Sequence, residues 1–126
     1  MKRHLSLVLL ALISVFALPA YQDYVIRGKR TEGRSALMDA AARLERYYSD
    51  NNAFAAAANT LVAGIDNKSA NQHYSISITI ASPYQTYTLT ATPLTFSDDK
   101  CGNLTLTQAG TKGSSIGGNI RDCWGR

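Results

Sequence analysis

Few residues of this chain could do covalent or acid–base chemistry, and they are scattered along it. The candidates are two cysteines, two histidines, one pair of adjacent carboxylates and one pair of adjacent serines: Cys101, Cys123, His4, His73, Asp98-Asp99 and Ser114-Ser115. The sequence has no phosphate-binding glycine loop, HExxH motif or CxxC motif. Because catalysis needs a nucleophile, a base and an orienting group in one place, we expect no enzyme, no catalytic or metal site, no cofactor and no small-molecule substrate.

The polar candidates have simpler structural interpretations. Asp98-Asp99 come shortly before a cysteine, where we expect a solvent-exposed turn. His73 opens a predicted strand, and we expect it at the surface or at a strand edge. Ser114-Ser115 lie in a flexible tail without a histidine or an acid nearby in the sequence. None of the three therefore indicates a reaction.

The two cysteines are best explained by a disulfide bond. A basic start, Met1 to His4, runs into an apolar block, Leu5 to Ala20, as in exported chains. Cysteines of exported proteins usually pair because the compartment is oxidising. A Cys101–Cys123 bond would contribute about 3 kcal/mol on the chain-entropy model, whereas a zinc site would need more ligands.

The apolar block itself has two interpretations, which divide the chain into 1–20 and 21–126. It could be a secretory signal, cleaved after Ala17 or Ala20. It could also be retained in a membrane, although 5–20 is shorter than the roughly 20 residues that span a bilayer, and Pro19 would kink its end. Under either interpretation, the rest of the chain is exported.

Charge is modest and concentrated in one run. The chain carries a net charge of +4, and Lys2 and Arg3 account for two of those charges. The strongest cluster is Arg27, Lys29, Arg30 and Arg34. It could be a solvated helix face, a contact with anionic lipid headgroups or with the acids of a neighbouring subunit, or a nucleic-acid contact, although no aromatic platform is interleaved there.

The elements that would position these residues are one helix followed by a sheet. Apolar residues at helical spacing predict a helix over 21–50, with a connecting loop over 53–72. Alternating residues from 73 onward predict three or more antiparallel strands with one buried face. We expect the sheet to cover the helix stripe, burying Leu37, Leu44 and Tyr48 against Ile76, Ile78, Leu89 and Leu106. Residues 112–126 have little core potential, and we expect the disulfide to hold them down.

Three segments resemble type IV pilins. Residues 17–25, ALPAYQDYV, are similar to the segment just after the apolar half of the pilin N-terminal helix, and 36–52 resemble the helix that follows. Residues 98–113, DDKCGNLTLTQAGTKG, with Cys123-Trp124, resemble the disulfide-bounded end of small Gram-negative minor pilins. The resemblance implies an α+β pilin fold, in which a long N-terminal helix packs on an antiparallel sheet. The sheet and a disulfide-closed C-terminal region would together occupy residues 73–126.

The resemblance also implies partners and roles. Pro19 matches the helix-kinking proline, Tyr21 and Tyr24 match aromatics packed in the filament core, and the two cysteines match the disulfide pair. The implied partners are other pilin subunits, the pilus assembly machinery and the inner membrane before assembly, and the implied final location is the extracellular pilus. One departure is the missing Gly-Phe processing site and its glutamate, whose place falls near Lys2. This favours a cleaved secretory signal over a divergent pilin start.

The leading hypothesis is a structural minor pilin that contributes to pilus assembly, adhesion or motility through the surfaces of 53–72 and 112–126. One alternative is a DNA-binding pilin for DNA uptake, with a basic patch near the disulfide that binds phosphate. Its residues would be Lys100, Lys112, Arg121 and Arg126. The other alternative is a secretion-system pseudopilin, although the sequence has no Asp-rich calcium loop.

Overall fold

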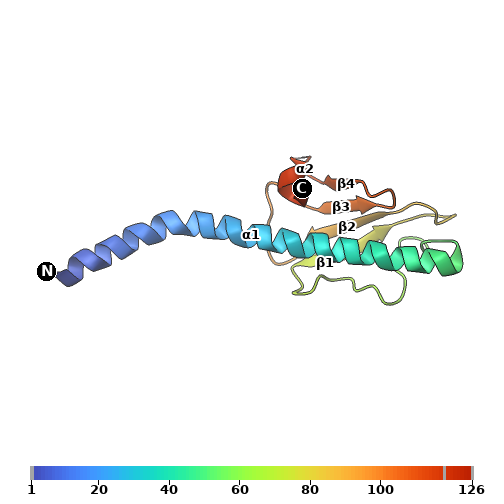
Figure 1. Cartoon of the computed structure of the whole chain (residues 1–126), viewed down its shortest axis with the longest axis horizontal. Helices are drawn as coiled ribbons and strands as arrows, with labels where there is room; N and C mark the ends of the chain where they lie inside the picture. The colour runs from blue at the N-terminus through green and yellow to red at the C-terminus, as the bar shows by residue number, and fades with distance from the viewer. Residues whose placement is uncertain (1, 118, 126) are drawn as a thin grey trace.

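The computed structural model describes residues 2–117 and 119–125, with side chains from Pro19 onward. The later part of one long helix, α1 (Lys2–Asn51), packs against a sheet, and together they form a head (Figure 1). The earlier part of α1 extends well beyond this head. The 50 residues of α1 would measure about 75 Å at 1.5 Å per residue. Its first part protrudes and bends before it reaches the head (Figure 1).

Helix α1 continues through the predicted boundary between residues 20 and 21. Pro19 lies inside α1, and the helix begins at Lys2, not near Tyr21. The expected division into 1–20 and 21–126, and the role of Pro19 as the kink, stay predictions. Within the described part of the chain, no helix has the combined length and hydrophobicity that crossing a bilayer requires.

The sheet is an antiparallel meander in which each strand pairs with its neighbour in sequence. It contains β1 (Tyr74–Thr79), β2 (Thr88–Pro93), β3 (Leu104–Thr107) and β4 (Lys112–Ser114), in the order β1-β2-β3-β4. Ile78 lies opposite Leu89, which lies opposite Leu106. The alternation places these apolar side chains on the face that packs against α1, with serine and threonine on the other face.

The core forms between α1 and that inner face, which confirms the expected α+β class. Leu37 and Leu44 of α1 are fully buried, and Tyr48 is partly buried beside them. The sheet residues expected to cover them are also buried: Ile76, Ile78, Leu89 and Leu106. The hydrophobic stripe and the strand alternation were therefore sufficient to identify the packing faces.

The C-terminal region contributes more to the core than its composition indicated. Residues 112–126 supply β4 and a short helix, α2 (Ile120–Trp124). The Trp124 side chain is only 5% exposed, and its Nε1 donates a hydrogen bond to the carbonyl oxygen of Gly113, at 2.9 Å. The expectation of little core potential was wrong, because one buried tryptophan covers a large apolar area even in a Gly- and Ser-rich segment.

The disulfide between Cys101 and Cys123 is present, as expected, with a Cα–Cα distance of 5.6 Å. Both cysteines are buried. The bond joins the segment before β3 to α2, two parts of the chain that flank the same region of α1. It therefore helps to fix the positions of the residues next to each cysteine.

Candidate functional site

A recess lined mainly by basic side chains lies between α1 and the disulfide-bonded segments; we call it the basic recess. Helix α1 forms one wall, Lys100 comes from the segment before β3, and the C-terminal region forms the third side. The lining residues are Arg27, Arg30, Thr31, Arg34, Lys100, Arg121, Asp122 and Gly125. Residues far apart in sequence thus gather beside the Cys101–Cys123 bond.

The innermost basic residue of the recess belongs to a buried ion pair. The guanidinium of Arg30 donates from Nε to Asp98 Oδ2 at 2.6 Å and from Nη2 to Oδ1 at 2.7 Å. The two side chains are only 4% and 1% exposed. Asp98 Oδ1 also accepts hydrogen bonds from the backbone N–H groups of Lys100 and Cys101. This pair therefore ties α1 to the turn that carries Lys100.

The carboxyl group of Asp98 is ionised in this setting. Burial alone would raise its pKa, but the hydrogen bonds from Arg30 and the Cys101 N–H, with the charge of Arg30, hold the pKa below its ordinary value. The expected solvent-exposed turn at Asp98-Asp99 was therefore wrong for Asp98. Periodicity along the chain cannot show that a turn carboxylate faces an arginine 68 positions away.

The rim of the recess carries the other cations, which are exposed except for the half-buried Arg34. Arg34 donates from Nη1 to the carbonyl oxygen of Cys123, at 3.1 Å, and from Nη2 to Thr31 Oγ1, at 2.7 Å. These contacts fix its position without neutralising its charge. Arg27 pairs with Asp23 at 2.8 Å, but its side chain is still 70% exposed. Lys100 and Arg121 are both exposed.

The structure brings together two of the four residues predicted to bind DNA. Lys100 and Arg121 line the same recess. Lys112 lies elsewhere, with its Nζ 5.6 Å from the centroid of the Trp124 ring. Arg126 lies outside the described residues. In their place the recess contains Arg27 and Arg34, which belong to the basic run of the helix but were not connected with the disulfide region from sequence.

That basic run is not one solvated face. Arg30 is buried against Asp98, and Lys29 places its Nζ 4.9 Å from the centroid of the Phe96 ring. Only Arg27 and Arg34 of the run remain available at the rim. The interpretation of the whole run as a solvated face was therefore wrong, because helical spacing directs every third or fourth residue toward the head.

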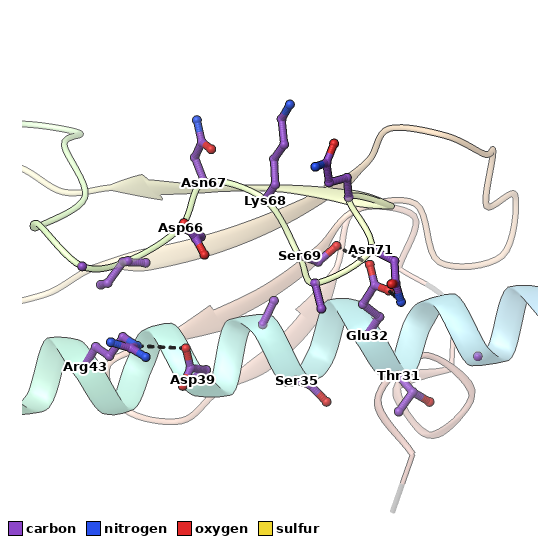
Figure 2. Close-up of a pocket in the computed structure, with 16 residues that line it drawn as sticks. Thr31, Glu32, Ser35, Asp39, Arg43, Asp66, Asn67, Lys68, Ser69 and Asn71 are labelled. Carbon is purple, nitrogen blue, oxygen red and sulfur yellow. Dashed lines mark hydrogen bonds and ion pairs between the residues drawn. The ribbon is translucent and has the colours of Figure 1, made fainter.

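A second surface is the polar groove between α1 and residues 64–72 of the connecting loop (Figure 2). Glu32 points from the helix toward the loop, and it accepts hydrogen bonds from Ser69 Oγ, from Asn71 Nδ2 at 2.7 Å and from the N–H of His73 at 3.2 Å. Burial would raise the pKa of Glu32, but these donors hold it below its ordinary value. Because the carboxylate oxygens of Glu32 already accept hydrogen bonds that hold the loop, we assign this residue a structural role.

Sequence reasoning missed both Glu32 and the Arg30–Asp98 pair.

Residues Asn67 and Lys68 point outward from the groove in Figure 2, so the loop still offers an exposed surface. His73 is half-buried, with its Nδ1 in a hydrogen bond with Thr95 Oγ1 at 2.5 Å. It directly precedes β1, which agrees with the strand-edge expectation.

Comparison with known proteins identifies similar chains. The family model described as type IV minor pilin ComP, DNA uptake sequence receptor, matches residues 19–105. A solved structure of a type IV pilin from Shewanella oneidensis is 27% identical, with a TM-score of 0.57 over 79% of this chain and 98% of that chain. No curated protein matches the chain. The family match ends before Arg121, so the C-terminal wall of the basic recess lies outside it.

Proposed function

This chain belongs to the type IV minor pilin ComP family, and from that premise we propose that its head captures DNA at the basic recess. It is a structural minor pilin subunit of a type IV pilus, with the pilin fold that the resemblance implied. Such a subunit is exported and assembles with other pilins. The fold and the family are those of structural proteins, and we infer that this chain performs no catalysis.

The observation that carries the DNA proposal is the convergence of cations around the basic recess. Among the described residues, Arg27, Arg34, Lys100 and Arg121 line it, with Asp122 as the one carboxylate that remains exposed in the lining. DNA affinity depends mainly on neutralising backbone phosphates. Arginine in particular matches the geometry of phosphate oxygens. The head offers this chemistry although its overall charge is only mildly positive.

The recess predicts how binding should depend on salt. If the four cations each neutralise one phosphate, log K should fall with log salt with a slope of about −3.6. Replacing Lys100 and Arg121 together by glutamine should reduce the slope by about two, since each phosphate contact contributes about one. The matched control replaces Arg46 and Lys68, two exposed cations that do not line the recess.

Fluorescence anisotropy with a duplex oligonucleotide at several salt concentrations decides the proposal. Weaker binding and a smaller slope for the recess variant, with the control unchanged, support it. Absence of binding by the native chain at low salt would end it, as would equal losses in both variants. The family description names a DNA uptake sequence receptor, so a preferred sequence should compete better than a scrambled one.

We also propose a route for the subunit: held at the inner membrane before assembly, loaded by the pilus assembly machinery, and then displayed on the extracellular pilus. The protruding part of α1 supports this route (Figure 1). So do Tyr21 and Tyr24, which are 64% and 75% exposed and therefore available for packing in a filament core. Neither comparison favours the alternative of a secretion-system pseudopilin. Intact mass and N-terminal sequencing of the exported protein will show whether residues 1–20 are retained.

A further inference from the structure

The basic recess lies at one end of the head, where α1 leaves it. Figure 1 shows α2 and the connection between β2 and β3 at that end, next to the start of the protruding helix. The recess is formed by these same three parts of the chain. The cations of the recess therefore lie around the point at which the helix leaves the head.

The chemistry along α1 changes in a definite order toward the recess. Residues 5–20 are apolar in sequence, Tyr21 and Tyr24 follow as highly exposed aromatics, and Arg27 begins the basic recess. At 1.5 Å per residue, Tyr24 and Arg27 are separated by about 4.5 Å along the helix axis. Hydrocarbon, interfacial aromatics and headgroup-binding cations follow one another in the same order across one leaflet of a bilayer.

We propose that the basic recess docks on anionic phospholipid headgroups when the head sits at a membrane. Arg34 is well placed to bind a headgroup phosphate, because contacts with Cys123 and Thr31 hold its guanidinium at the rim. Lys100 and Arg121 approach from the other two sides. This inference does not rest on DNA binding, but since both ligands present phosphates, lipid and DNA compete for one site.

The neighbouring carboxylates leave a net positive recess. Asp98 is buried and satisfied by Arg30, so it does not repel a phosphate. Asp23 offsets part of the charge of Arg27, and Asp122 lies in the lining. Each basic residue near an anionic surface strengthens binding by about fivefold at room temperature. Losing two of them should weaken binding to anionic membranes by roughly 10- to 30-fold.

Vesicle binding by the full chain tests the proposal. Vesicles of phosphatidylcholine alone measure what the apolar start contributes, and vesicles with added phosphatidylglycerol measure the charge-dependent part. The variant with Lys100→Gln and Arg121→Gln should lose the charge-dependent part by the factor above. The control with Arg46→Gln and Lys68→Gln should retain it, and circular dichroism should show both variants folded. Equal losses in the two variants, or native binding that ignores phosphatidylglycerol, would overturn the proposal.

The single tryptophan reports the orientation of the head. Trp124 lies in α2, which forms one wall of the recess. Lipids that carry a quencher in the headgroup should reduce its fluorescence on anionic vesicles, and the recess variant should show less quenching. Because Trp124 is only 5% exposed, the readout is the difference between the two chains, and measurable quenching of the native chain that the recess variant shows to the same extent would overturn the proposal. A recess variant that loses DNA binding but keeps binding to anionic vesicles would also overturn it while leaving the DNA proposal intact.

Discussion

Replacing Gly33 by alanine should destabilise the head, although the same change normally stabilises a helix. Alanine is favoured over glycine inside a helix by about 1 kcal/mol. At Gly33, however, an added Cβ would lie 2.9 Å from Cε2 of Tyr74, a fully buried ring in the core. Overpacking of a core typically costs about 1–3 kcal/mol. The net effect of Gly33→Ala should therefore be a loss of roughly 0–2 kcal/mol.

Gly28 provides the matched control on the same helix. No atom outside its neighbourhood lies within 4 Å of a Cβ built there, so Gly28→Ala should gain up to about 1 kcal/mol. The two variants should then differ by about 1–3 kcal/mol in urea unfolding, or by at least roughly 4 °C in Tm. A double-mutant cycle with Tyr74→Leu should show that the Gly33 penalty depends on the ring. Equal stabilisation by both alanines, or strict additivity in the cycle, would refute the packing argument.

Three further predictions concern the polar and covalent contacts that hold the head together. Arg30→Ala leaves the buried carboxylate of Asp98 unpaired and should cost about 3–5 kcal/mol in urea unfolding. Arg43→Ala, which breaks an exposed pair with Asp39, should cost under about 1 kcal/mol, and a similar loss in both variants would contradict the prediction. The lowered pKa values of Asp98 and Glu32 contribute stability that is present above the ordinary carboxyl pKa near 4 and is lost as pH falls through the folded-state values. An acid titration of unfolding should therefore show a steep loss below about pH 4 that Glu32→Gln reduces, and an unchanged profile in that variant would count against the assignment. Replacing both Cys101 and Cys123 by serine should lower stability by about 3 kcal/mol and weaken binding at the recess; retained stability and binding would contradict the role given to the bond.

The parts of the fold that could be predicted from sequence are those set by local periodicity. The spacing of Leu37 and Leu44 identified the buried side of the helix, and the alternation around Ile78 and Leu89 identified the buried face of the sheet. Each pattern depends on residues only a few positions apart, because one element repeats its own geometry. The cysteine pairing could be predicted for another reason: the exported chain has only two cysteines.

The recess could be predicted only in part, because its geometry depends on contacts between distant segments. Lys100 and Arg121 could be connected through the neighbouring cysteines. Nothing in the sequence showed that Arg30 would turn inward to Asp98 while Arg34 stayed at the rim, since both belong to one basic run. The use of Glu32 to fasten the loop at Ser69 also joins distant positions. Polar contacts between distant positions leave no periodic pattern in the sequence, so they could not be predicted from it.

The most direct test of the account is whether the chain is present in assembled pili. Pili sheared from cells that express the native chain should contain it, detected by mass spectrometry at a small fraction of the main subunit, as expected for a minor pilin. Replacing the residues before Tyr21 by a cleavable secretory signal should remove the chain from the pili while leaving the exported head folded. Finding the native chain only as a free soluble protein, and absent from sheared pili, would contradict the account.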